Sequence, residues 1–446
     1  MLRFRIFLQD HLNSFRVILL SFFFLILTGA LLLCLPFAST GKGSVSFLNA
    51  LFTSTSAACV TGLVVFDTAT TWTLFGRIVI LLLIQIGGLG VITAAAAILS
   101  LTGVQIGILP RQAMQDAVSA PEIGGIVRFM SFLITGTLLI ELVGALLLFP
   151  VFAVQKGPVA GLGYAIFHSV SAFCNAGFDL MGAEAPFSSL TAYAVNIPLN
   201  LVIMILIILG GLGFLTWEDL LSCRFRFRRL RLQSKLILLM TGLLLLLPFL
   251  YFFLIEFRSF PGRERLLYSL FQSVTPRTAG FNTFDYAQMS ESGWLITILL
   301  MITGGAPGST AGGMKVTTLA VLLVSSATFQ GKNREVHCFR RRIELEVIQS
   351  AMTLMTLYIG LLVIGTLIMS TVESVPVLPA MFECASALGT VGLTTGITPG
   401  LSTVSRIMLI IFMFFGRTGG LTLGYALASP TYKNEGRRPA EDVTVG

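Results

Sequence analysis

Eight long apolar segments dominate this chain of 446 residues, near residues 17–38, 73–101, 126–154, 191–222, 234–257, 292–329, 344–371 and 401–428. Each approaches or exceeds the roughly 20 residues that a helix needs to cross a bilayer. Charged residues make up 11% of the chain, whereas a soluble domain carries about 25%. The sequence therefore predicts an all-α integral membrane protein with eight spanning helices in a lipid bilayer.

Basic residues gather in alternate gaps between these segments, namely Arg3, Arg5, Arg16, Arg111, Arg128, the stretch from Arg224 to Lys235, Lys332, Arg334, Arg340, Arg341, Arg342, Lys433, Arg437 and Arg438. The opposite gaps hold fewer, so the positive-inside rule places both termini in the cytoplasm. The net charge of +8 belongs to these short loops and forms no basic face with interleaved aromatic residues. We therefore expect no nucleic-acid partner.

A glycine-rich stretch, "GGAPGSTAGGMKVTT" from Gly304 to Thr318, superficially resembles a phosphate-binding loop. Such a loop requires Lys where Met314 stands, and a strand before the loop where this chain has an apolar run. The six cysteines and three histidines show no metal-ligand spacing. We expect neither an enzyme nor an organic cofactor.

Four semi-apolar stretches of about ten to fifteen residues fill the outward gaps, too short to cross a membrane and too apolar for solvated loops. They are "VSFLNALFTSTSAA", "GLGYAIFHSVSAF", "RERLLYSLFQSVTP" and "PVLPAMFECASAL". Each leads into a short segment that ends in glycine and a large apolar residue: "CVTGL", "CNAGF", "RTAGF" and "GTVGL". The stretches therefore predict four re-entrant pore helices, each followed by a glycine segment.

The unit of spanning helix, pore helix, glycine segment and second spanning helix occurs four times, at a period of about 100 to 115 residues. A phenylalanine precedes the glycine by ten residues in three copies, and Phe271 precedes it by nine in the third. The predicted repeats are residues 1–105, 106–232, 233–342 and 343–446, the third with a broken second helix. Further glycine clusters, such as "GGLGVIT" and "GGLGFLT", lie in the second spans.

Four such units can surround a pseudo-fourfold ion pore, because non-helical backbone at membrane depth must be buried or line water. Rings of carbonyl oxygens can replace the hydration shell of a potassium ion. The predicted filter residues are those of the four glycine segments: Val60, Thr61 and Gly62; Asn175, Ala176 and Gly177; Thr278, Ala279 and Gly280; Thr390, Val391 and Gly392. None is ionised, which favours a conducted monovalent ion over a tightly bound divalent one.

The fourfold repeat, the single-glycine filters, "RTAGF" and "GGAPGSTAGG" resemble the Trk/Ktr/HKT superfamily of potassium transporters. Eight spans without an extra leading pair are most similar to the membrane subunit of bacterial Ktr-type potassium uptake systems. The resemblance implies channel-like K⁺ uptake in a bacterial cell membrane, with K⁺ at the filter residues and Na⁺ as a candidate activator. It also implies a homodimer regulated by a cytoplasmic, nucleotide-binding ring of RCK type (KtrA-like).

We expect the broken third-repeat span to form a movable gate beneath the filter, at Gly304, Gly305, Gly308, Ser309, Thr310, Gly312, Gly313 and Lys315. The alternative is a helix kink that serves packing. By resemblance, Arg417 is an electrostatic barrier below the filter; the alternative is a structural pair with a pore-helix dipole or with Glu383. Arg277 is expected to support the third filter segment.

Thr53, His168, Gln272 and Glu383 each follow the pore-helix phenylalanine and are expected to hold the filter by hydrogen bonds. Asp67, Asp179 and Asp285 follow three filters, and either concentrate cations or lie in solvated loops. The competing function is a secondary K⁺/Na⁺ symporter with a broken-helix site at the membrane midplane. Transporter repeats usually come in pairs, so four similar units favour a pore.

Overall fold

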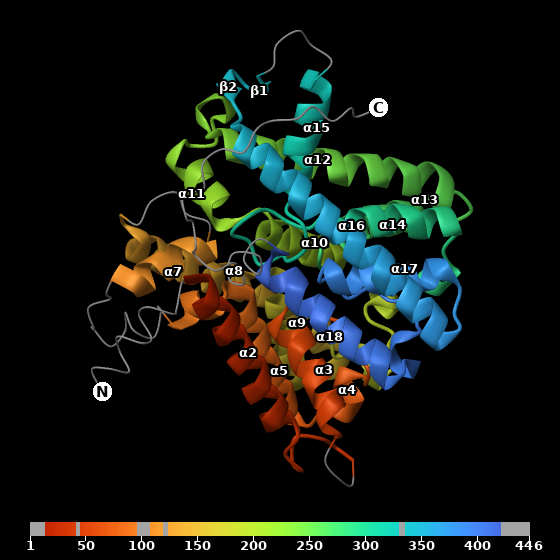
Figure 1. Cartoon of the computed structure of the whole chain (residues 1–446). Helices are drawn as coiled ribbons and strands as arrows, with labels where there is room; N and C mark the ends of the chain where they lie inside the picture. The colour runs from red at the N-terminus through yellow and green to blue at the C-terminus, as the bar shows by residue number, and fades with distance from the viewer. Residues whose placement is uncertain (1–13, 42–44, 96–107, 119–123, 330–334, 421–446) are drawn as a thin grey trace.

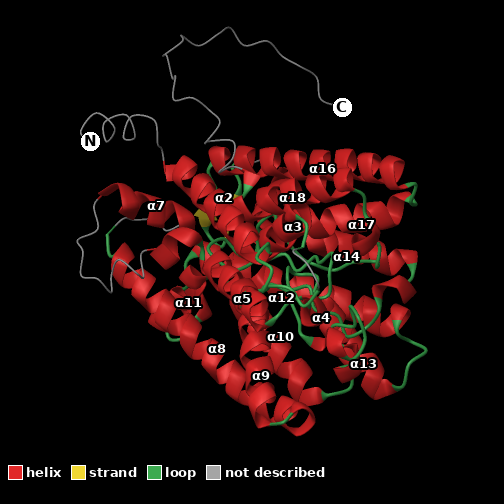
Figure 2. Cartoon of the chain, turned by 90° about the horizontal axis from the view of Figure 1, so that it is seen from below, coloured by secondary structure: helices red, strands yellow, loops and turns green. Residues whose placement is uncertain are grey.

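The computed structural model describes residues 14–41, 45–95, 108–118, 124–329 and 335–420 (Figure 1). The tails of two predicted spans, at 96–101 and 421–428, lie outside these residues. So do Arg3, Arg5, Lys332, Arg334, Lys433, Arg437 and Arg438. The described chain is mainly helical, as the apolar segments predicted, with loops between the helices and two short strands (Figure 2).

Each repeat contains a long apolar helix followed by a shorter one. The long helices are α2 (Ser14–Leu33), α8 (Ile126–Lys156), α12 (Leu232–Tyr251) with its π-helical extension η4 (Phe252–Glu256), and α16 (Leu345–Glu373). The short helices are α3 (Phe47–Ala58), α9 (Pro158–Phe173), α13 (Gly262–Val274) and α17 (Val377–Leu388). Among the described helices, the four long ones can each cross a bilayer by length and composition. The short helices coincide with the predicted pore helices.

The second helix of each repeat is shorter than its apolar segment. These helices are α5 (Leu74–Leu89), α10 (Ile197–Gly211) with α11 (Phe214–Ser222), α14 (Glu291–Ile302) with α15 (Val316–Phe329), and α18 (Thr403–Thr418). Helices α10 and α11 meet at an angle of 92°. The predicted break in the second helix of the third repeat is present, and the second helices of the other three repeats are also interrupted at their glycine clusters.

The remaining elements are short and belong to the loops. They are α4 (Thr68–Thr71), α7 (Ile108–Val118), η1 (Met181–Ala183), η2 (Thr191–Tyr193), η3 (Phe227–Arg229), η5 (Tyr286–Gln288), η6 (Thr398–Gly400), and the antiparallel strands β1 (His337–Cys338) and β2 (Arg341–Arg342).

Contacts between repeats close into a ring. Helix α5 of the first repeat packs on pore helix α9 of the second, α10 packs on α13, α14 packs on α17, and α18 of the fourth repeat returns to α3 of the first. Each pore helix also packs on the long helix of its own repeat. Four units therefore surround a common centre, although the exact repeat boundaries stay a prediction.

Every second helix begins at a residue whose side chain accepts a hydrogen bond from the first turn. These residues are Thr73, Asn196, Ser290 and Ser402. Such caps satisfy one of the backbone N–H groups that a helix start leaves without a partner. The four starts are therefore encoded locally.

The glycine clusters let three second helices touch the last residue of their pore helix. A Cβ atom placed on Gly87 would lie 2.0 Å from the Ala58 carbonyl oxygen. The same atom on Gly210 would lie 1.9 Å from the oxygen of Phe173, and on Gly416 it would lie 2.2 Å from that of Leu388. Only glycine permits this approach of two backbones.

Three residues further on, Gly90, Gly213 and Gly419 adopt φ values of 89°, 85° and 84°. A side chain rarely adopts these angles. The helix ends there in each of the three repeats.

We predict that Gly87→Ala lowers the free energy of unfolding by about 1–3 kcal/mol, because the added methyl group overpacks the contact with α3. Thermal or denaturant unfolding in detergent measures the change. Gly360→Ala in α16 is the matched control, since nothing lies within 4 Å of its added Cβ. Equal stability of the two variants would contradict this account of the helix contact.

Candidate functional site

Each pore helix gives way to a glycine segment with an unusual backbone. The first residue of every segment has positive φ without being glycine: 58° at Val60, 57° at Asn175, 69° at Thr278 and 50° at Thr390. The glycine two positions later also has positive φ: 89° at Gly62, 66° at Gly177, 81° at Gly280 and 93° at Gly392. Non-glycine residues adopt this region only where the surrounding structure enforces it.

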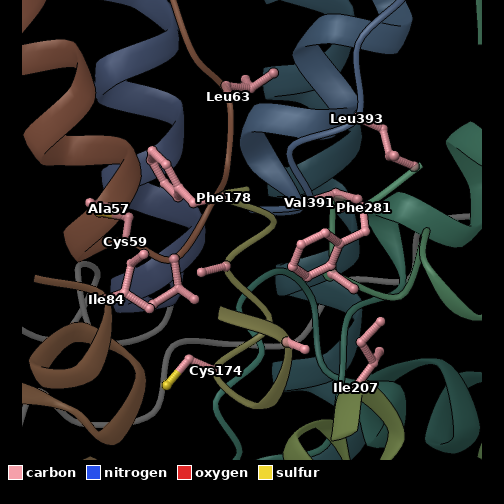
Figure 3. Packing of buried hydrophobic residues seen from close by; sticks show 14 of the residues in the cluster. Ala57, Cys59, Leu63, Ile84, Cys174, Phe178, Ile207, Phe281, Val391 and Leu393 are labelled. Carbon is pink, nitrogen blue, oxygen red and sulfur yellow. The ribbon is translucent and has the colours of Figure 1, made fainter. Parts of the chain in front are cut away.

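The four glycine segments contact one another in the interior of the protein, and Figure 3 shows buried residues of all four, among them Leu63, Phe178, Phe281 and Val391. A Cβ atom placed on each glycine would collide with a carbonyl oxygen of the next repeat: Gly62 with Ala176 at 2.5 Å, Gly177 with Ala279 at 2.7 Å, Gly280 with Val391 at 2.3 Å, and Gly392 with Thr61 at 2.2 Å. Each repeat thus contacts the next one along the chain, and the fourth repeat contacts the first. The structure thus brings together all four predicted segments.

A hydroxyl group near the end of each pore helix holds its glycine segment. Ser56 and Ser386 accept hydrogen bonds at 3.0 Å from the N–H groups of Gly62 and Gly392. Ser171 and Thr275 instead donate to the carbonyl oxygens that follow the glycine, those of Phe178 and Phe281.

Sequence reasoning missed these hydroxyl groups, although a signal was present. Ser56, Ser171 and Ser386 precede their glycines by six residues, whereas Thr275 precedes Gly280 by five. The shorter spacing matches the residue missing before the third glycine.

The large apolar residue after each glycine anchors the segment from behind. Leu63, Phe178, Phe281 and Leu393 are each no more than 2% exposed. Figure 3 shows these side chains among the buried residues around the glycine segments. The backbone is therefore held by hydroxyl groups on the pore helix and by packing beyond the glycine.

The predicted hydrogen bonds from the residue after the pore-helix phenylalanine exist in three repeats. His168 Nε2 accepts from the N–H of Leu180 at 3.4 Å. Gln272 accepts from the Tyr286 hydroxyl, and Glu383 accepts from the threonines that follow Gly392. Thr53 differs, because its hydroxyl donates to Asn49 in its own helix.

The break between α14 and α15 forms an intramembrane loop (residues 304–315) that lies against the second and fourth repeats. The N–H of Ala306 donates to the Gly211 oxygen at 2.9 Å, and the N–H of Gly313 donates to the Gly416 oxygen at 3.0 Å. The Thr310 hydroxyl donates to the oxygen of Phe173, the last residue of α9, at 3.0 Å.

The intramembrane loop also touches a glycine segment directly. A Cβ atom on Gly312 would lie 2.1 Å from Thr390 Oγ1, and one on Gly313 would lie 3.0 Å from the Gly389 oxygen. Gly308 approaches the end of α7 in the same way, because its Cβ would lie 2.5 Å from the Val118 oxygen. Gly304 and Gly305 are themselves buried within the loop, and Ser309 Oγ closes a turn by donating to the Ala306 oxygen.

Two positively charged side chains contact this loop. The Arg417 guanidinium donates to the carbonyl oxygens of Gly87 and Gly88 in the first repeat and of Thr310 in the loop. Lys315 Nζ donates to the Ala311 oxygen at 2.8 Å. The alternative pairing of Arg417 with Glu383 is therefore wrong, because backbone oxygens hold the guanidinium.

A cavity of about 250 Å³ adjoins the intramembrane loop, and Arg417 and Lys315 line it together with Asp116 of α7. Ionised side chains at membrane depth usually mark an ion or substrate pathway. No group of three or more His, Cys, Asp or Glu side chains could hold a metal ion within the described ranges.

Arg277 and the three predicted aspartates mainly organise the backbone. Arg277 donates to Thr241 of α12 at 3.4 Å, which ties the third glycine segment to the long helix of its repeat. Asp67 accepts from the N–H groups of Ala69, Thr70 and Phe187, so it joins the outer loops of two repeats. Asp179 and Asp285 each accept from the N–H two residues ahead.

Comparison with known proteins agrees with this architecture. Residues 13–435 match the TrkH family, described as cation transport proteins. The chain is 39% identical to the potassium/sodium uptake protein NtpJ of Enterococcus hirae over 98% of both chains. It is also 39% identical to the Ktr system potassium uptake protein B of Bacillus subtilis, over 97% of this chain and 96% of that protein.

The crystal structure of the potassium transporter TrkH from Vibrio parahaemolyticus has the same fold, with a TM-score of 0.73 at 21% identity over 94% of this chain and 86% of that one. The match to the family covers residues 13–435, which include all four pore helices and their glycine segments. The chain is a multi-pass membrane protein that belongs to the TrkH family of cation transport proteins, which are not enzymes.

Proposed function

We propose that this chain is the ion-conducting subunit of a bacterial potassium uptake system and works as a channel-like pore. The observation that carries the proposal is the closed ring of Thr61, Ala176, Ala279 and Val391 carbonyl oxygens, each within 2.7 Å of a Cβ placed on the neighbouring glycine. Such a ring can replace the water around a monovalent cation. Two relatives cited above, a potassium/sodium uptake protein and a Ktr system potassium uptake protein, support potassium as that cation.

The ring of four repeats favours a pore over a symporter with paired repeats and a midplane site. Ion flux that follows the electrochemical gradient is the expected behaviour. Accumulation strictly coupled to Na⁺ or H⁺, and independent of membrane voltage, would overturn the channel-like mechanism.

The intramembrane loop is proposed to be the gate, with Arg417 as an electrostatic barrier beside it. The loop is bonded to the second and fourth repeats and, through Arg417, to the first. Its glycines and Ser309 carry little bulk, so the loop can move once its hydrogen bonds to the second repeat, to Gly416 and to Arg417 open. A helix kink that serves packing alone would not require the Arg417 guanidinium to join the loop, at Thr310, to the carbonyl oxygens of Gly87 and Gly88 in another repeat.

The remaining assignments extend the proposal to the assembly. We place both termini in the cytoplasm of a bacterial cell and assign the chain to a homodimer gated by a nucleotide-binding ring. The Bacillus subtilis relative is named as protein B of a Ktr system, and a system with lettered components supports the presence of a partner subunit. The exposed basic face formed by η3 and strand β2 offers a site for it. Na⁺ as an activator belongs to the same proposal.

We predict that the unmodified chain rescues a potassium-uptake-deficient bacterium at low external potassium, whereas Gly280→Ser does not. The serine side chain would meet the Val391 oxygen at 2.3 Å and displace it from the ring. Growth and rubidium uptake, normalised to protein in the membrane, provide the measurement. Gly400→Ser is the matched control, because nothing lies within 4 Å of its Cβ. Equal rescue by Gly280→Ser would remove the filter assignment.

We also predict that deleting residues 308–311 from the intramembrane loop raises the rate of uptake, since the loop obstructs the path.

Arg417→Gln should also raise the rate of uptake, because it removes the positive charge that we propose as a barrier. Arg406→Gln in the same helix serves as the control, because its guanidinium bonds Asn49 and Pro399 away from the loop. Unchanged flux after the deletion refutes the gate.

A further inference from the structure

Glu383 lies in pore helix α17 and is completely buried. Its Oε1 accepts hydrogen bonds from the Thr394 hydroxyl at 2.6 Å and from the N–H and hydroxyl of Thr395 at 2.9 and 3.3 Å. Its Oε2 accepts from the Thr398 hydroxyl at 2.6 Å. All three threonines follow Gly392, so the carboxyl group holds the segment by which the chain leaves the fourth glycine segment.

The hydrogen bonds accommodate an ionised carboxylate. The N–H of Thr395 can only donate, and Thr394 Oγ1 accepts from the N–H of Gly396 at 2.9 Å, which leaves its own hydrogen for Glu383. Oε1 therefore faces donors. The Thr398 hydroxyl lies 2.6 Å from Oε2 and 3.1 Å from Thr394 Oγ1, and its hydrogen is available to Oε2 when the carboxyl group is ionised.

No basic side chain within the described ranges forms an ion pair with this carboxylate. The Arg406 guanidinium donates to Asn49 and Pro399, and that of Arg417 donates to backbone oxygens. A buried charge without a partner of opposite sign is costly. A cation in the adjacent pathway is the mobile charge that can offset it.

The equivalent position is uncharged in the other repeats. Thr53 and Gln272 carry no charge. His168 lies between the Tyr164 oxygen, 2.7 Å from Nδ1, and the N–H of Leu180, which donates to Nε2. That arrangement fits the neutral ring with its proton on Nδ1. The negative charge thus belongs to the fourth repeat alone.

From these contacts we infer that Glu383 sets the cation affinity of the pathway: its fixed negative charge, held against the segment that follows Gly392, raises the affinity of the ring of glycine segments for monovalent cations. The inference rests on the proposed function. It adds an electrostatic asymmetry to a ring whose backbone geometry is nearly fourfold.

The test measures rubidium uptake against external concentration in the rescued bacterium. Glu383→Gln keeps the size of the side chain and removes its charge, so the half-saturating concentration should rise about tenfold, the order expected from one nearby charge. Gln272→Glu places a carboxyl group at the equivalent site of the third repeat, where the Tyr286 hydroxyl donates to the side-chain oxygen. That variant should lower the half-saturating concentration severalfold.

Thr398→Val separates charge from structural support, because it removes one donor and keeps the carboxylate. Its half-saturating concentration should stay within about twofold of the unmodified chain, even where its melting temperature falls. The inference is overturned if Glu383→Gln leaves the half-saturating concentration unchanged, or if Thr398→Val raises it equally.

Should Glu383→Gln fail to reach the membrane, Gln272→Glu decides alone, and an unchanged or higher half-saturating concentration overturns the inference. Absence of uptake by the unmodified chain would instead refute the proposed function.

Discussion

Backbone polar groups at membrane depth need partners, and the interior of this protein depends on that requirement. The four glycine segments and the intramembrane loop leave helical geometry where lipid offers no hydrogen bonds. Hydroxyl groups of Ser56, Ser171, Thr275 and Ser386 satisfy groups beside the glycines. The carbonyl oxygens between the positive-φ residues lie against the glycines of the neighbouring repeat, and these are the groups that we propose as ligands of a cation that has lost its water.

The third repeat carries most departures from fourfold symmetry. Its glycine segment starts one residue earlier relative to Phe271, and its second helix opens into the intramembrane loop instead of a single break. Arg417 of the fourth repeat and the glycine cluster of the first complete the surroundings of that loop. One repeat thus carries the loop that we propose as the gate, while the first, second and fourth repeats supply the surfaces that contact it.

The positions of the pore helices could be predicted from the sequence, because semi-apolar stretches of that length have few other places in a membrane protein. The glycine segments could be predicted as well, since only glycine tolerates the close approach and the backbone angles found at Gly62 or Gly392. The hydrogen bonds of His168, Gln272 and Glu383 were expected from their shared position. The partners of Arg417 were not, because carbonyl groups from two distant segments, Gly87–Gly88 and Thr310, leave no local pattern.

By itself, the sequence determined the membrane environment, the four repeats and the residues that leave helical geometry, because length, hydropathy and glycine act locally along the chain. Only the tertiary structure decided which repeat contacts which, where the loop of the third repeat lies, and which carbonyl oxygens surround Arg417. Those outcomes depend on contacts between residues more than 100 positions apart, such as Arg417 and Thr310, which are 107 apart. Packing in three dimensions selects such contacts, and no periodicity along the chain records them.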